Sequence, residues 1–419
     1  MKPLEGITIV ELARVLACPF ADMLLAEMGA TVIKIEQPGR GDETRGYEPF
    51  VGAEAVRAEL PEDRRDDEEA IAAAIGTERS AYFYACNRGK QSITVNLRHP
   101  EGQAIVKRLA ADADVLLENF PTGRLARLGL DWPALQPLNE RLIYVSCTGF
   151  GQTGPLAARK GYDTVFQAMG GLMSLTGEAG GGPVKPGLPV ADLTSGLWIA
   201  LAVLSMITGR HQTGKGGYLD FSMLDGQISL LTLAAARHFA LGEIPARLGT
   251  EHPGRVPSAT FRCKDGGYVH ITGADQHWAP LCELLGLAEW GADKRFATNS
   301  GRVRHRVEVM ERLTAAIAGL TRQELCDACD RAAVPAGPVR DLGEVLHDDH
   351  VTARGLVQDF DHPEAGAFPA LALPFKFEGF DNPELSRPPT LGEHTDTILA
   401  GRLGMGSDEI ARLRAEGAI

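Results

Sequence analysis

Two short apolar strands flank a helical segment at the start of the chain, and this arrangement restricts the fold more than any other feature of the sequence. Residues 7–11 (ITIVE) and 31–36 (TVIKIE) are rich in β-branched residues, and residues 19–28 between them carry apolar side chains at helical spacing. Such a strand, helix and second strand form a βαβ unit, in which the two strands run parallel. The chain is therefore expected to build a parallel sheet.

The same pattern recurs further along the chain. Its next members are predicted at residues 92–95 (strand), 102–111 (helix), 114–117 (strand) and 142–147 (strand). We therefore predict an open, doubly wound α/β sheet over residues 1 to about 150. The segment 53–78 interrupts the pattern, and its charged, alanine-rich composition predicts a helical excursion on the surface.

Beyond this sheet the sequence predicts a long apolar helix and a smaller α+β region. The helix covers residues 193–209, and the α+β region covers residues 255–335. The longest apolar run, 197–207, is about half of the ~20 residues that a membrane-spanning helix needs, so we expect a buried core helix. The stretch 335–340 (PAGPVR) is typical of a linker.

Charge and cysteine content exclude several classes of function. A net charge of −13 argues against a nucleic-acid or membrane-surface binder, although it allows a local basic pocket. Seven cysteines without a signal-peptide pattern favour reduced thiols and a cytoplasmic protein. The Cys326–Cys329 pair lies in a helical pattern without a second pair, so no metal site is expected.

One glycine motif allows a dinucleotide-binding alternative. Residues 149–154 (GFGQTG) match G-x-G-x-x-G directly after a predicted strand. However, Pro155 follows at once, Asp163 comes too early for the ribose-binding acid, and the turn of the first βαβ unit has no glycine. We therefore favour a flexible loop over a nicotinamide-cofactor site.

Asp192 has both a structural and a catalytic interpretation. At the predicted start of the apolar helix it is a candidate N-cap residue. The glycine-rich stretch 176–183 precedes it, and helix amides would keep such a carboxylate ionised and able to attack an activated acyl group. Basic residues in the N-terminal half are candidate phosphate contacts or solvated surface charges; they are Arg40, Arg45, Arg98, Arg124, Arg127 and Lys160.

The chain resembles the class III CoA transferases, the family of formyl-CoA transferase and carnitine-CoA transferase, essentially from end to end. The matching segments, in order, are LEGITIVEL, GATVIKIEQPGRGDETR, NRGKQSITVNL, LLENFPTGRLARLGLDW, LIYVSCTGFGQTGP, KGYDTVFQAMGGLMSLTG, PVADLTSG and RPPTLGEHTD. The resemblance implies that Asp192, with Gly196 in a D-x-x-x-G segment, is the covalent nucleophile. It also implies CoA or acyl-CoA as a substrate, with no prosthetic group.

The resemblance assigns further residues to CoA. Those expected to contact it are Val15, Leu16, Ala17, Val95, Asn96, Asn119, Phe120, Arg127, Lys160 and Tyr162, the last near the thioester. Gly181 and Gly182 resemble the approach to the nucleophile. Gln37 stands where many relatives carry an arginine that meets the nucleotide, and Arg40 is a candidate substitute.

The resemblance also implies an intertwined homodimer of two-domain subunits. We expect a large domain from residues 1–215, a linker at 216–254, a small domain at 255–334, and a linker with the C-terminal part of the large domain at 335–419. The segments GYEPFVG, PVKPGLPVADLTSG and RLGTEHPGRVPSATF are similar to the branch that passes CoA from succinyl-CoA to another dicarboxylate. Arg45 and Arg255 are then candidates for the second substrate carboxylate.

A 2-methylacyl-CoA racemase of the same fold is the alternative enzyme, and a non-catalytic CoA- or nucleotide-binding protein is the alternative of another class. The racemase motif reads G-H-D where this chain reads Gly161-Tyr162-Asp163. A tyrosine, with an ordinary pKa of about 10, is a poor base near neutral pH. The intact Asp192 segment speaks against a non-catalytic protein.

Overall fold

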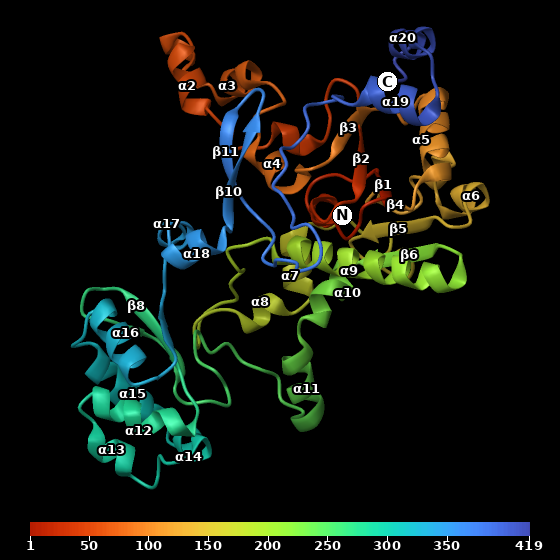
Figure 1. Cartoon of the computed structure of the whole chain (residues 1–419). Coiled ribbons are helices and arrows are strands. Elements are labelled where there is room, and N and C mark those ends of the chain that lie inside the picture. The colour runs from red at the N-terminus through yellow and green to blue at the C-terminus, as the bar shows by residue number, and fades with distance from the viewer. The chain divides into compact units, whose positions relative to one another are not determined.

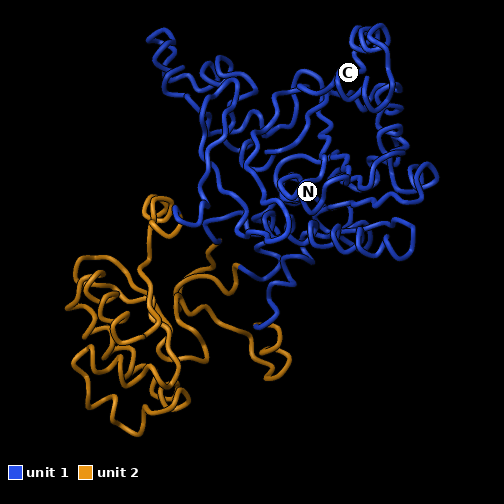
Figure 2. The backbone as a smooth tube through the Cα atoms, viewed as in Figure 1, with its two compact units in different colours: residues 1–172, 186–233, 352–419 blue, residues 173–185, 234–351 orange.

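The computed structural model describes residues 1–419 and divides into two compact units (Figure 2). Unit 1 comprises residues 1–172, 186–233 and 352–419, and unit 2 comprises residues 173–185 and 234–351. The segment 216–254, expected as a linker, is largely structured instead. It contains the strand β6 (Gly217–Ser222) and the helices α10 (Met223–Ser229) and α11 (Thr232–Leu241).

The core of unit 1 is a six-stranded sheet in which every neighbouring pair of strands is parallel. Its order is β3-β2-β1-β4-β5-β6. The first five strands are β1 (Thr8–Glu11), β2 (Thr31–Glu36), β3 (Gln91–Thr94), β4 (Val115–Glu118) and β5 (Ile143–Thr148). The order reverses between β1 and β4, which is the point at which open α/β sheets bind ligands. The predicted doubly wound parallel sheet is confirmed.

Helices cover both faces of this sheet (Figure 1). One face packs against α1 (Ala17–Glu27) and α9 (Val190–Thr213), and the other against α5 (Pro100–Asp112), α19 (Thr395–Leu403) and α20 (Ser407–Ala415). Successive strand residues therefore enter opposite cores: Ile9 lies in one and Val10 in the other. This is why the strands are apolar at consecutive positions rather than at alternate ones.

The remaining elements of unit 1 are short and lie around the sheet. They are η1 (Glu43–Gly46), α2 (Ala53–Glu59), η2 (Glu62–Arg64), α3 (Glu68–Ile75), α4 (Ala81–Asn87), η3 (Ala126–Leu128), α6 (Trp132–Leu135), η4 (Gln136–Leu138), α7 (Asp163–Met169), β10 (Val357–His362) and β11 (Gly366–Leu371). Residues 53–78 form the predicted surface helices, and α2 buries none of its side chains. Figure 1 shows α2 and α3 standing away from the sheet.

Unit 2 is a small α+β body with its own core. Its antiparallel strands are β7 (Ser258–Arg262), β8 (Tyr268–Thr272) and β9 (Ala336–Pro338). Its helices are α12 (Asp275–Leu284), α13 (Ala288–Ala292), α14 (Asn299–Arg304), α15 (Arg306–Ile317), α16 (Arg322–Arg331) and α17 (Leu342–Leu346). Two short helices, α8 (Leu172–Leu175) and α18 (Asp349–Arg354), lie where the chain passes between the units. The Cys326–Cys329 pair lies on α16, and all seven cysteines are free.

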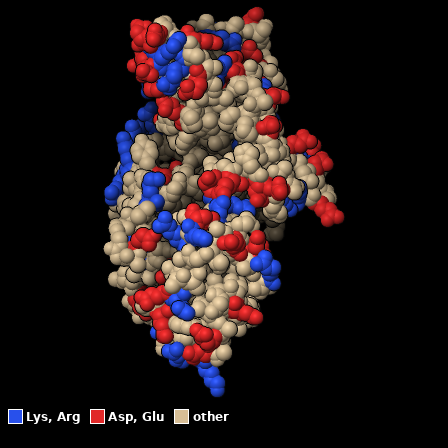
Figure 3. Space-filling model, turned by 90° about the vertical axis from the view of Figure 1, so that its left-hand side faces the viewer, with Lys and Arg blue, Asp and Glu red and all other residues tan.

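Surface charge is mixed in sign. On the face shown in Figure 3, lysine and arginine side chains lie among aspartate and glutamate side chains, and they form no continuous basic patch.

Helix α9 is long and apolar enough, by length and composition, to cross a membrane. Its residues Ile199, Val203 and Ile207 instead pack against the sheet of unit 1. The opposite face is uncovered within the chain, with Leu197 and Leu201 more than half exposed. This helix is therefore a core helix with one apolar face open to a partner.

Candidate active site

Asp192 lies in the first turn of α9, half-buried, as the third helical residue. The N-cap position belongs to Pro189, whose side chain cannot cap, so the N-cap interpretation of Asp192 is wrong. A carboxylate in the first turn still benefits from the positive end of the helix dipole. The Asp192 side chain is therefore free of a capping role and available for chemistry.

The cap of α9 is supplied by Asp163, the first residue of α7. Its Oδ1 atom accepts hydrogen bonds from the backbone N–H groups of Ala191 at 2.8 Å and Asp192 at 3.2 Å. Its Oδ2 atom accepts one from Nε2 of Gln167 at 2.5 Å. These bonds fix the backbone of Asp192 and place a second carboxylate beside it.

The environment of Asp192 raises the pKa of its carboxyl group from 3.8 to about 7. Burial is the larger cause, because it disfavours the charged form, and the negative charge of Asp163 is the second. A carboxyl group that titrates near neutral pH is more basic, and therefore more nucleophilic when ionised, than an ordinary aspartate.

Gly196 brings Asp192 against the start of α1. A Cβ atom at this glycine would lie 2.7 Å from the carbonyl oxygen of Ala17 and 2.8 Å from Cδ1 of Phe20. Only glycine therefore lets α9 approach α1 so closely, one turn after Asp192. The D-x-x-x-G spacing thus places Asp192 one helical turn before the contact between α9 and the first turn of α1.

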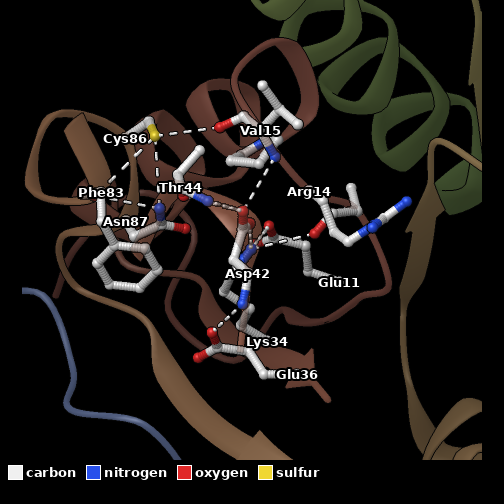
Figure 4. Close-up of polar contacts among 12 residues, drawn as sticks. Glu11, Arg14, Val15, Lys34, Glu36, Asp42, Thr44, Phe83, Cys86 and Asn87 are labelled. Atoms are coloured by element: carbon white, nitrogen blue, oxygen red, sulfur yellow. Dashed lines mark hydrogen bonds and ion pairs between the residues drawn. The ribbon is translucent and has the colours of Figure 1, made fainter. Parts of the chain in front are cut away.

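The β1–α1 turn, residues 12–16, is held by side chains from neighbouring elements (Figure 4). Asn119 binds both backbone groups of Arg14: its Oδ1 accepts from the N–H at 3.0 Å and its Nδ2 donates to the carbonyl at 2.7 Å. Asp42 Oδ1 accepts from the N–H of Val15 at 3.4 Å. Contacts within the protein therefore define the shape of the turn.

A cavity of about 390 Å³ opens at the carboxyl ends of β1 to β4, on both sides of the point where the strand order reverses. It is lined by Leu12, Arg14, Lys34, Ile35, Glu36, Gln37, Gly41, Asp42, Val95, Asn96, Leu97, Arg98, Phe120, Pro121, Arg124 and Leu128. This volume suits part of a nucleotide-sized ligand.

Two of the arginines that line this cavity are not engaged in an ion pair. Arg98 and Arg124 contribute only backbone hydrogen bonds, whereas Arg14 pairs with Glu43 at 3.6 Å and Lys34 is fully buried among carboxylates. The two free guanidinium groups give the cavity the charge that a phosphorylated ligand needs.

The residues predicted to contact CoA fall into three groups. Val95, Asn96 and Phe120 line the cavity, and so does Gln37. Bordering it through the β1–α1 turn are Val15, Leu16, Ala17 and Asn119, whereas Arg127, Lys160 and Tyr162 are exposed on the segments that follow β4 and β5. Arg40 does not line the cavity.

Arg45 must be withdrawn as a candidate for the substrate carboxylate. It is 1% exposed, and its guanidinium donates to both carboxylate oxygens of Glu36 at 2.8 Å and to Glu78 at 2.9 Å. Its charge also lies over the ring of Phe83, at 3.8 Å from the centroid. With a further bond from Nη2 to the carbonyl of Pro389, four of its five N–H donors are used within the protein, so it stabilises the fold.

The glycine-rich approach segment belongs to unit 2. Arg247 donates from Nε at 3.0 Å and from Nη2 at 2.7 Å to the carbonyl of Gly181, which holds this loop, and Gly182 lies exposed beside it. Arg255, the other candidate for the substrate carboxylate, is exposed in the same unit.

The G-x-G-x-x-G match does not open a helix. Residues 149–154 form a loop after β5, and the next helix begins at Asp163. The favoured loop interpretation agrees with this arrangement, which lacks the helix N-terminus that binds a pyrophosphate.

Sequence reasoning missed two residues beside Asp192. Asp163 entered as an acid in the wrong place for a dinucleotide site and as the last residue of the Gly161-Tyr162-Asp163 segment, but without a role of its own. Tyr82, on α4, is buried enough for its pKa to be raised, and the charge of Asp192 contributes to this shift after burial and Cys86. No sequence pattern signalled that either residue lies near Asp192, because both approach it from distant segments.

Comparisons with known proteins agree on one family. The family model described as CoA-transferase family III matches residues 4–395. The chain is 40% identical to succinate–glutarate CoA-transferase of Agrobacterium fabrum, covering 95% of each chain, and 38% identical to succinyl-CoA:glutarate CoA-transferase of Mus musculus, covering 100% of this chain and 91% of the relative. A crystal structure of a CaiB/BaiF family protein from Brucella suis matches with a TM-score of 0.81 and 40% identity, covering 96% of this chain and 99% of that one.

Proposed function

The chain belongs to CoA-transferase family III, and from this premise we propose that it passes CoA from succinyl-CoA to a second dicarboxylate through covalent intermediates on Asp192. The observation that carries the proposal is the position of Asp192, a carboxyl group with a pKa of about 7, at a helix start brought against α1 by Gly196. The family resemblance seen in the sequence is confirmed, and the protein is a class III CoA-transferase.

The cavity at the carboxyl ends of β1 to β4 is the proposed site of the CoA nucleotide. Arg98 and Arg124 offer unpaired charges to its phosphates, and Val95, Asn96 and Phe120 form its walls. Arg124, which lines the cavity, is a better candidate than Arg40 for the contact that Gln37 cannot make. Arg127, Lys160 and Tyr162 lie on the adjoining segments, where the rest of the ligand would pass.

The first half of the reaction moves CoA onto the enzyme. Ionised Asp192 attacks the thioester carbonyl, the carbon–sulfur bond breaks, and CoA leaves as a thiolate while a mixed aspartyl–succinyl anhydride forms. The thiolate then attacks the aspartyl carbonyl of the anhydride. This step releases succinate and leaves CoA as a thioester on Asp192.

The second half reverses these steps with a new acid. The acceptor carboxylate attacks the aspartyl thioester and displaces the CoA thiolate, which gives a second anhydride. The thiolate attacks the acceptor carbonyl, and Asp192 returns as a free carboxylate. Over both halves, protons and electrons balance and one thioester is exchanged for another, so the mechanism requires no prosthetic group or metal. Water must be excluded, because it would hydrolyse the anhydride intermediates.

The racemase alternative needs a second base beside the α-carbon, and the residue at the position of its motif histidine is Tyr162, which is 79% exposed. Three relatives that are 36–40% identical to this chain also carry transferase names. Both observations favour transfer.

Relatives with 36–40% identity are named for succinate or succinyl-CoA with glutarate. We extend this substrate class to the present chain: succinyl-CoA as donor and dicarboxylates of four to six carbons as acceptors. Since Arg45 is occupied, Arg255 remains our candidate for the distal carboxylate, with Gly181 and Gly182 as the flexible approach.

A homodimer is the proposed assembly. The apolar outer face of α9, with Leu197, Trp198 and Leu201, continues on α10 with Ile228. An exposed apolar patch of this kind is typical of a protein–protein interface, and a second copy of the chain would bury it. The seven unpaired cysteines support a cytoplasmic location.

The decisive experiment is to mix the enzyme with succinyl-CoA and glutarate and to analyse the CoA esters by mass spectrometry. Glutaryl-CoA should appear, and Asp192→Ala should abolish its formation while CoA still binds. Digestion after exposure to succinyl-CoA alone should yield a peptide with CoA, or a hydroxylamine-reactive bond, on Asp192. Near-normal turnover of Asp192→Ala would refute the nucleophile, and preference for a monocarboxylate would refute only the substrate class.

A further inference from the structure

Val15, at the centre of the β1–α1 turn, has a left-handed backbone with φ of 72°. Left-handed conformations are rare for any residue other than glycine and are least favourable for a β-branched one. In this chain only Val15 and Ala333 combine positive φ with a side chain. Such strain persists only where surrounding contacts enforce it, and it is concentrated at functional sites.

Four neighbouring side chains enforce this conformation from outside the turn. Asn119 binds both backbone groups of Arg14, and the Sγ–H of Cys86 donates to the carbonyl of Val15 at 3.4 Å. Lys34 Nζ donates to the carbonyl of Ala13 at 3.1 Å. The fourth is Asp42, which holds the Val15 N–H (Figure 4). Each peptide group of the turn from Ala13 to Val15 therefore has a side-chain partner.

Asp42 connects the strained residue to a buried charge cluster. Its Oδ2 lies 2.9 Å from Lys34 Nζ, and Lys34 pairs with Glu11 at 2.8 Å, all three side chains being fully buried or nearly so. Glu11 also pairs with Lys90 at 2.8 Å. Although burial opposes ionisation, the Lys34 ammonium and the bonds from Thr44 lower the pKa of Asp42, so it stays ionised.

Stability alone does not account for this cluster, since removing charges from water offsets much of the attraction between them. Its location gives it a use. Lys34 and Asp42 line the cavity, and the turn they hold leads into α1, against which Gly196 packs one turn from Asp192. A displaced turn would disturb both the cavity wall and the neighbourhood of Asp192.

We propose that Asp42 is a positioning residue, which uses the buried charge cluster to hold Val15 in its left-handed conformation so that the β1–α1 turn is preformed for acyl-CoA. The inference rests on the proposed function, because it takes acyl-CoA as the ligand of the turn. Preforming a turn removes an ordering cost from binding, so losing Asp42 should weaken acyl-CoA binding more than it slows the bound-state chemistry.

The test is a double-mutant cycle in the full-length enzyme between Asp42→Asn and Val15→Gly, because glycine adopts this φ without strain. Asp42→Asn should raise the KM for succinyl-CoA by roughly tenfold or more, the loss expected for one hydrogen bond to a charged group. In the Val15→Gly background the same change should cost at least about threefold less, which is within the range for contacting residues. Val15→Ala is the matched control, and it should give no such relief.

Thermal unfolding of every variant accompanies the kinetics. If Asp42→Asn does not fold, Asn119→Asp replaces it, since it keeps the acceptor for the Arg14 N–H but loses the donor to the Arg14 carbonyl. Rescue by Val15→Gly and not by Val15→Ala supports the inference. Additive effects, or equal rescue by both, overturn it. A wild-type enzyme that fails to bind CoA in calorimetry would instead refute the proposed function.

Discussion

Replacing Asp163 by asparagine should move the pH dependence of transfer to lower pH. Asparagine keeps an oxygen that can accept the N–H groups of Ala191 and Asp192, now at 2.8 and 3.2 Å, so the cap of α9 survives. What disappears is the negative charge beside Asp192. The variant therefore separates the electrostatic role of Asp163 from its structural one.

The structure sets the size of this effect. The pKa of Asp192 rises from 3.8 to about 7, and burial is the larger of the two causes, so the Asp163 charge accounts for less than half of the rise. We expect Asp163→Asn to lower the pKa of Asp192 by about 1, to about 6. In the proposed mechanism the nucleophile is the ionised form of Asp192. At pH 6 its population should then increase from about a tenth to about a half, roughly fivefold.

The assay is the pH profile of kcat/KM for succinyl-CoA, whose acid limb reports the free enzyme. Asp220→Asn is the matched control, because Asp220 also accepts a backbone N–H, that of Gln152 at 3.0 Å, but does not contribute to the pKa of Asp192. The acid limb should shift down in Asp163→Asn and stay in place in Asp220→Asn. An acid limb that stays near pH 7 or rises in Asp163→Asn would refute this account of the site.

Three further outcomes follow from contacts described above. Gly196→Ala places a methyl group 2.7 Å from a carbonyl oxygen of α1 and should destabilise the protein by about 1–3 kcal/mol in denaturant unfolding, whereas the solvent-facing Gly209→Ala on the same helix should not. Arg98→Gln and Arg124→Gln should each weaken CoA binding in calorimetry by about 1.5–3 kcal/mol. Binding of dephospho-CoA, which lacks the 3′-phosphate, should weaken less. Equal losses for both ligands would show that these arginines do not contact the 3′-phosphate. Burial lowers the pKa of His362 from 6.5 to about 4, so protonation favours the unfolded chain. The free energy of unfolding should therefore fall by up to about 3 kcal/mol as pH drops from 6.5 to 4, and His362→Gln should flatten that dependence.

Much of the fold could be predicted because the sheet is encoded locally. Each strand and each crossover helix is a continuous segment with its own apolar pattern, so the sequence alone indicates a parallel sheet with helical cover. The segment 216–254 was misjudged as a linker for a related reason. The edge strand β6 has one side open, with alternating exposure, and lacks the continuous apolar run of the central strands.

The sequence by itself also indicated which carboxylate to propose as the nucleophile. Asp192 lies in PVADLTSG, four residues before Gly196. Residues i and i+4 share one face of a helix, and a side chain at Gly196 would clash with α1, so the spacing itself has a steric reason. The family followed from many such segments in one order. These are properties of short stretches of chain, which no distant contact has to supply.

Only the tertiary structure decided how the charges are used. Arg45 and Arg124 are equally basic in sequence, yet the fold buries the first against Glu36 and Glu78 and leaves the second free in the cavity. Asp163 meets Asp192 across 29 residues of chain, and Asp42 meets Val15 across 27. The pKa of a carboxyl group and the conformation of a strained turn depend on burial and on neighbours from separate segments, and the order of the strands is what brings those segments together.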